Sequence, residues 1–230
     1  MNAPTAVSPA GPVGDDGAAQ YDARWQRIVD CVALKRPDRM PVALYATFWL
    51  CRYGGVSHRT LMYDYERTRE IAERAILEFE PDVYSPMILG TAQGPSLEAI
   101  GYKQLQWPGH GVGEDQPFQY LDREYMTADE YDDFLFDPSG YYLHTYLPRV
   151  AWAFEGFEQL PIFPGLHYTR LVAAMRSFGR PAVRAALDRV TKAAEEIDRF
   201  VLHHADFTAR MRALGYPCTN GTTGIAPYDF

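Results

Sequence analysis

Apolar positions along the chain alternate between helical spacing and short continuous runs. Trp25, Ile28 and Val32 repeat every three or four residues, which predicts a helix over about residues 21–35. Residues 42–50 are almost wholly apolar and rich in strand formers. Such a run is typical of a fully buried parallel strand, although a short buried helix has the same pattern.

A second helix and strand follow. Residues 64–79 place an apolar face at helical spacing, and residues 82–88 form another short strand-like run. The order helix, strand, helix, strand predicts an α/β fold with parallel strands. A third strand is expected near residues 216–218.

The middle of the chain has another character. Residues 90–126 are rich in glycine, and their strand-like pieces predict a loop or small hairpin over one end of the sheet. Thr127 and Glu130 form a capping box that begins a short helix. Residues 181–214 carry a long amphipathic pattern, with a break near residues 203–208 as one option.

Composition and charge exclude several classes of function. The chain has 230 residues, 47% of them hydrophobic, and a net charge of −8. It has no block of basic residues, so nucleic acid and anionic membranes are not expected partners. No apolar run is long enough to span a bilayer. Residues 1–20 predict a disordered tail, and a cytoplasmic location is expected.

The cysteines predict neither a disulfide framework nor a local metal site. Cys31, Cys51 and Cys218 are odd in number and widely spaced, and no Cys-x-x-Cys or His-x-Cys pair occurs. The chain is therefore expected to bind no zinc tightly. It also lacks the glycine-rich phosphate motifs, so nucleotide binding has no support.

Several spaced motifs resemble a known family. The stretch Arg27-Ile28, residues 35–42 and the segment from Phe79 to Asp82 resemble the opening of the uroporphyrinogen decarboxylase (URO-D) superfamily. The middle is similar to an uncharacterised or cobalamin-dependent-methyltransferase-like branch, at Trp107-Pro108-Gly109-His110-Gly111, Pro117-Phe118-Gln119, Glu130-Tyr131-Asp132, Asp137-Pro138, Leu147-Pro148-Arg149 and Ala226-Pro227-Tyr228-Asp229.

The resemblance implies a (β/α)8 TIM barrel over residues 21–230. Such a barrel needs about 250 residues, whereas only two strand–helix units are evident before residue 90. The expectation is a partial barrel, the N-terminal part, with the C-terminal strands missing and no activity on its own. Its open strand edges predict poor stability or self-association.

The resemblance also implies a choice between two activities. The superfamily holds porphyrinogen decarboxylases and methyltransferases that move methyl groups from methyl-corrinoids to thiols. Of the arginine-rich stretch that follows the first strand of the decarboxylases, only Arg52 has a match here. Their Ser-Asp pair after the second strand is replaced by Ser85-Pro86. A methyltransferase-like parent is therefore favoured, with a divergent uroporphyrinogen decarboxylase or a non-catalytic half-barrel binding protein as alternatives.

Cofactors and partners follow from the same resemblance. The methyltransferases hold zinc through a His-x-Cys pair and a later cysteine in the C-terminal half. Zinc and a corrinoid protein are therefore expected for a full-length parent, and none for this chain. The expected substrate is a small molecule, either a tetrapyrrole or a methyl donor.

Candidate substrate-binding residues lie where barrel active sites lie, at the carboxyl ends of strands. No catalytic or metal-binding residue is assigned. Arg52 and the loop over residues 107–119 are expected to face one pocket. The alternative for Arg52 is a surface or interdomain salt bridge, and a turn histidine without chemistry is the favoured interpretation of His110 by itself. The candidates are Thr47, Trp49, Arg52, Ser85, His110, Gln119 and Asp229.

Overall fold

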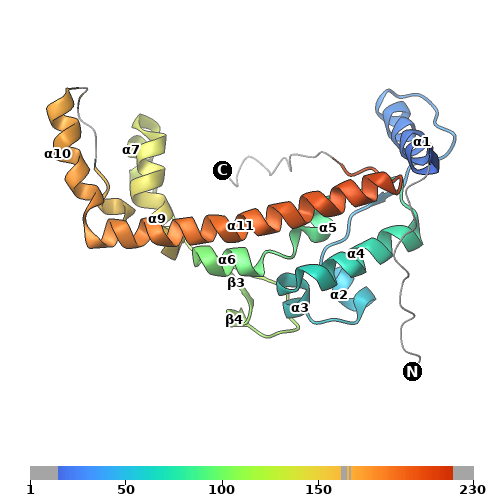
Figure 1. Ribbon diagram of the computed structural model, residues 1–230, viewed down its shortest axis with the longest axis horizontal. Coiled ribbons are helices and arrows are strands. Elements are labelled where there is room, and N and C mark those ends of the chain that lie inside the picture. The colour runs from blue at the N-terminus through green and yellow to red at the C-terminus, as the bar shows by residue number, and fades with distance from the viewer. Residues whose placement is uncertain (1–14, 162–164, 166, 220–230) are drawn as a thin grey trace. The chain divides into compact units, whose positions relative to one another are not determined.

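The computed structural model describes residues 15–161, 165 and 167–219 (Figure 1). Internal contacts divide the chain into two compact units. Unit 1 comprises Met1–Gly54, Glu66–Gly90 and His203–Phe230, and unit 2 comprises Gly55–Tyr65 and Thr91–Leu202.

Unit 1 contains a parallel sheet with helices. Strands β1 and β2 pair in parallel, Ala43 with Val83 and Leu44 with Tyr84. Tyr84 also forms a parallel bridge to Cys218, so a third parallel segment lies where the sequence predicts one. The elements are α1 (Asp15–Val32), β1 (Ala43–Leu44), α2 (Trp49–Gly54), α4 (Tyr65–Phe79), β2 (Val83–Tyr84), α5 (Met87–Gly90) and the last turns of α11 (Pro181–Ala213).

The predicted strand over residues 42–50 is wrong in length and in burial. Only Ala43 and Leu44 form β1, and Ala43 is exposed. The amide of Leu50 then donates to the Thr47 carbonyl (3.0 Å) and turns the chain into α2. The apolar run therefore supplies an edge strand and the buried side of a short helix, which periodicity alone does not separate.

The helix predicted over residues 64–79 is confirmed as α4. Its buried face consists of Thr68, Ile71, Ala72, Ala75 and Ile76, while Phe79 is half exposed. Helix α1 begins at Asp15, so residues 15–20 are helical rather than part of the predicted tail.

Unit 2 is built from short elements. Strand β3 pairs antiparallel with β5, Leu105 opposite Tyr120, which confirms the predicted hairpin. Helix α6 was not predicted, because its Gly94-Pro95 start has the composition of a turn. The elements are α3 (His58–Tyr63), α6 (Gly94–Ile100), β3 (Leu105–Pro108), β4 (Gly111–Val112), β5 (Gln119–Tyr120), η1 (Ala128–Glu130), α7 (Tyr131–Phe136), α8 (Pro138–Tyr141), η2 (Tyr142–Tyr146), α9 (Leu147–Val150), η3 (Trp152–Phe154), η4 (Phe157–Gln159) and α10 (Tyr168–Phe178).

Capping signals fix the ends of α7 and α11. The capping box of Thr127 and Glu130 is present ahead of α7. Helix α11 runs unbroken for 33 residues, so the break considered near residues 203–208 does not occur. The Thr208 hydroxyl donates to the His204 carbonyl (3.0 Å), which satisfies it inside the helix. Gly215, at φ +87°, follows as the left-handed stop.

The fold class is α/β with parallel strand pairing. In the residues that the structure describes, the strands do not close into a barrel. Within those same ranges, no helix has the length and apolarity needed to cross a membrane.

Candidate functional site

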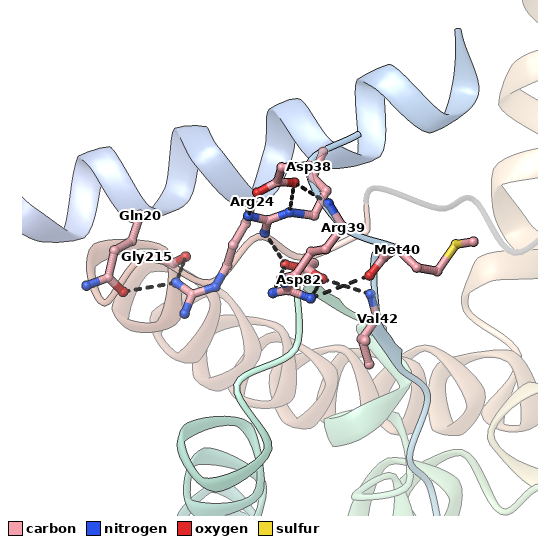
Figure 2. Close-up of polar contacts among 9 residues, drawn as sticks. Gln20, Arg24, Asp38, Arg39, Met40, Val42, Asp82 and Gly215 are labelled. Atoms are coloured by element: carbon pink, nitrogen blue, oxygen red, sulfur yellow. Dashed lines mark hydrogen bonds and ion pairs between the residues drawn. The ribbon is translucent and has the colours of Figure 1, made fainter. Parts of the chain in front are cut away.

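The amino ends of the parallel strands in unit 1 converge on one buried carboxylate. Asp82 immediately precedes β2 and is fully buried. It accepts hydrogen bonds from Arg39 Nη1 (2.8 Å) and Nη2 (2.6 Å) and from the Val42 amide (2.8 Å), and it pairs with Arg27. Figure 2 shows these contacts joining the approach to β1 with the start of β2.

A second carboxylate completes this network. Asp38 accepts two hydrogen bonds from the Arg27 guanidinium, at 2.6 and 2.7 Å. The hydrogen bond from Arg27 lowers the pKa of Asp38 to about 2, and in turn Asp38 raises the pKa of Arg27. Arg27, Asp38, Arg39 and Asp82 all lie in the segments that resemble the URO-D opening, so one structural cluster accounts for the motif.

The position of this network indicates a structural role. In barrels and open α/β sheets, ligands bind beyond the carboxyl ends of the strands, while groups at the amino ends stabilise the fold. Asp82 satisfies two guanidinium groups and a backbone amide there, as a buried charge requires. The chemistry of the site is therefore sought at the opposite end.

A pocket of about 550 Å³ lies at the carboxyl end, in unit 1. His204 Nε2 is 3.1 Å from the Pro86 carbonyl oxygen. Because a carbonyl only accepts hydrogen bonds, Nε2 carries the hydrogen. The lining residues are Pro86, His204, Ala205, Thr208, Ala209, Arg212, Cys218 and Thr219.

The side chain of Tyr84 lies beside this pocket with its hydroxyl unsatisfied. Tyr84 is almost fully buried, and its hydroxyl has no hydrogen-bond partner among the described residues. Burial raises the pKa of Tyr84, and the neighbouring Cys218 thiol adds to the rise. The phenol therefore stays protonated at neutral pH, and the side chains of Thr208 and Cys218, which line the pocket, lie next to it.

The other polar groups of the pocket differ in what they offer a ligand. Burial raises the pKa of the Cys218 thiol, so it is not a thiolate at neutral pH and is unsuited to nucleophilic attack. Arg212 is exposed and lies over the Tyr21 ring, 5.1 Å from its centroid. It is the cation among the described residues that line the pocket, and none of those residues is an acid.

Thr47 and Ser85 follow the short strands β1 and β2, and both make local hydrogen bonds. The Thr47 carbonyl accepts from the Leu50 amide. Ser85 Oγ accepts from the Met87 amide (3.2 Å), and the Ser85 amide donates to the Leu44 carbonyl (2.9 Å). Both side chains are half-buried, and neither lines the pocket.

Trp49 and Arg52 lie on α2. Trp49 stacks on Tyr53 with centroids 4.9 Å apart and contacts Phe79 at the end of α4, at 5.7 Å. Arg52 is exposed. Neither residue lines the pocket of unit 1.

His110 and Gln119 belong to the hairpin of unit 2. His110 stacks on Trp107 (4.5 Å), and its Nε2 is 3.6 Å from a Glu98 carboxylate oxygen. Gln119 is exposed and pairs with Gln106 in the strand ladder. Because Arg52 belongs to unit 1 and His110 to unit 2, a pocket shared by them stays a prediction. Asp229 lies outside the described residues.

Sequence reasoning missed the helical wall of the pocket. His204, Thr208 and Arg212 recur every four residues and so share one face of α11. That spacing was visible in the sequence. The contact of this face with Pro86 and Cys218 depends on tertiary structure, and no local pattern predicts it.

Within the described ranges, no three His, Cys, Asp or Glu side chains form a group that could hold a metal ion. Comparison with known proteins adds no relative, since no family model, curated protein or solved structure matches the chain. The site is therefore interpreted from its own geometry.

Proposed function

We propose that this chain supplies the opening strands and helices of a (β/α)8 barrel enzyme of the URO-D superfamily, whose parent transfers a methyl group between a corrinoid and an acceptor. The Asp82 network carries the proposal. It gathers the residues that resemble the family's opening at the amino ends of two parallel strands. A barrel of this type keeps its amino ends for stability and its carboxyl ends for the ligand.

The chemistry of the pocket favours a ligand with neutral acceptor groups. A corrinoid carries amide side chains, which accept hydrogen bonds from groups such as the Tyr84 hydroxyl. A porphyrinogen carries several carboxylates, each of which needs a cationic partner. Arg212 is the cation in the described lining, and one cation matches the corrinoid better.

The residues that follow β2 also favour methyl transfer over decarboxylation. The decarboxylases require a carboxylate after the second strand, whereas here Ser85 Oγ caps the Met87 amide and the Pro86 carbonyl accepts from His204. A corrinoid protein as partner and a cytoplasmic location belong to this proposal. No chemical step is assigned to zinc, because the resemblance places its ligands in the C-terminal half of the family's barrel.

Binding to the purified chain tests the proposal. Methylcobalamin and uroporphyrin are each titrated into the chain, and binding is followed by quenching of tryptophan fluorescence. Tighter binding of methylcobalamin is expected. Tighter binding of uroporphyrin would contradict methyl transfer and favour the decarboxylase, and binding of neither would contradict both enzymes and leave the binding-protein alternative.

Two variants locate the ligand. Tyr84→Phe removes the unsatisfied hydroxyl and should weaken methylcobalamin binding about tenfold, the loss of roughly 1.4 kcal/mol of hydrogen bonding. Its free energy of unfolding should not fall, because no hydrogen bond within the protein is lost. The second variant, Thr208→Val, removes a hydroxyl from the pocket lining and should also weaken binding. Thr191→Val is its matched control. Thr191 bonds its own i−4 carbonyl on α11 as Thr208 does, but lies outside the pocket.

A further inference from the structure

Helix α10 presents an apolar stripe to solvent. Tyr168, Leu171, Val172 and Met175 fall at positions i, i+3, i+4 and i+7, which lie on one face of a helix. Each is between 53% and 70% exposed, and no residue of α10 is buried. A face of this pattern normally packs against another element.

Helix α7, in the same unit, presents a second exposed apolar face. Tyr131, Leu135 and Phe136 are between 53% and 92% exposed. By helical geometry Asp132 lies between Leu135 and Phe136 on that face. This exposure indicates that α7 too has a surface available to a partner.

The two surfaces carry opposite charge. Residues 127–141 contain acids and no Lys or Arg, whereas residues 167–180 contain three arginines and no acid. Arg176 borders the stripe of α10, one position after Met175. In the part of the chain that the structure describes, no ion pair engages Asp132 or Arg176.

We infer that α10 of one chain packs on α7 of a second copy, with Met175 and its stripe against Leu135 and Phe136, and Arg176 beside Asp132. The two copies are related by a two-fold axis in this arrangement, so the contact is made twice and the dimer is closed. Burial of the apolar faces drives the association, and the charges fix the pairing of α10 with α7 rather than with itself.

Sedimentation velocity of the wild-type chain over a range of concentrations is the first test. A monomer–dimer equilibrium that does not extend to larger species is expected, because the two-fold contact closes. A chain that stays monomeric up to about 100 μM overturns the inference, because the dissociation constant would then be weaker than that of a typical specific interface.

Charge reversal tests the pairing itself. Asp132→Arg and Arg176→Asp should each weaken the dimer by roughly tenfold or more, because each places like charges at both contacts. An equimolar mixture of the two variant chains should restore the wild-type dissociation constant. In the mixed dimer each α7–α10 contact again joins opposite charges. A mixture no tighter than the separate variants contradicts the pairing.

A matched pair of substitutions separates this surface from general stickiness. Leu171→Asp should abolish the dimer, whereas Leu202→Asp, at a still more exposed leucine of unit 2 on α11, should leave it unchanged. Arg184→Glu, on the exposed side of α11, is the control for the charge changes. Far-UV circular dichroism confirms that each variant stays folded. An equal loss of dimer in Leu171→Asp and Leu202→Asp counts against α10 as the contact.

Discussion

The side chain of Asp82 links the approach to β1 with the start of β2. Its carboxylate is fully buried and joins Arg27, Arg39 and the Val42 amide. A buried charge with this many donors tolerates no neutral replacement, because the guanidinium groups are then left without a counter-charge.

Asp82→Asn is therefore expected to lower the free energy of unfolding by roughly 3 kcal/mol. This is the lower end of the cost of breaking a buried ion pair, because Arg39 is half exposed. Urea unfolding measures it. The comparison variant is Asp38→Asn, which removes an exposed carboxylate and should cost clearly less than Asp82→Asn. Equal losses in the two variants would show that the buried network does not hold this end of the sheet.

The lowered pKa values of two carboxylates lead us to expect a loss of stability in acid. The hydrogen bond from Arg27 lowers the pKa of Asp38 from 3.8 to about 2, and Arg149 lowers the pKa of Glu130. A carboxylate whose pKa is lower in the folded state stabilises the protein at a pH above its unfolded-state pKa. That stabilisation is lost as the pH falls through the folded-state pKa. Stability should therefore be constant above about pH 5 and decline toward pH 2.

The measurement is the urea midpoint of wild-type and Asp38→Asn chains between pH 6 and pH 2. The variant should show a shallower decline, because the Asp38 pair no longer titrates. Parallel pH profiles for the two chains would mean that Asp38 contributes nothing to the acid dependence.

At the scale of elements, α1 packs against the end of α11 through a glycine. Gly215 has φ +87°, and a Cβ there would lie 2.9 Å from Gln20 Cβ and from the Gly17 carbonyl oxygen. Arg24 donates to the Gly215 carbonyl at 2.7 Å (Figure 2). The stop of α11 and the docking of α1 therefore depend on the same residue.

Gly215→Ala should accordingly destabilise the chain by about 1–3 kcal/mol, from backbone strain and from displacement of α1. Gly179→Ala is the control, since Gly179 has no left-handed φ and its nearest neighbour is an ordinary 3.4 Å away. Thermal unfolding compares the two. A neutral Gly215→Ala would mean that α1 is not held at this position.

Helices were predicted better than strands, for a physical reason. Helix α4 and the start of α7 depend on periodicity and capping, which are local to Thr127 and its neighbours. The apolar run from Val42 onward carries no such signal. Whether it pairs as a strand depends on a partner forty residues away, and only two of its residues pair.

The same distinction governs the site. Thr47 and Ser85 lie just beyond the two short strands, because both strands end earlier than the apolar runs suggested. The pocket wall of His204 and Thr208 was not predicted, because α11 meets Pro86 only in the folded structure. Arg52 was selected because it follows the first strand and matches the resemblance, but it lies on the exposed side of α2.

At the scale of the whole molecule, the two ends of the parallel sheet in unit 1 have different roles. Charged residues that resemble the URO-D opening stabilise the amino ends, and the carboxyl ends carry a pocket with a protonated, unsatisfied phenol. Self-association has two candidate sources, the open strand edges expected from the sequence and the α7–α10 contact. Restoration by mixed charge-reversed chains distinguishes them, because strand edges do not respond to Asp132 or Arg176.

Hydrogen–deuterium exchange with and without methylcobalamin tests the central claim most directly. Exchange reports, segment by segment, which backbone amides become protected when the ligand binds. Protection is expected only in peptides around Tyr84–Pro86, residues 204–212 and Cys218, and Tyr84→Phe should need about tenfold more methylcobalamin to reach the same protection. Protection confined to the segment from Arg27 to Asp82 at the amino end, or none anywhere, would contradict it.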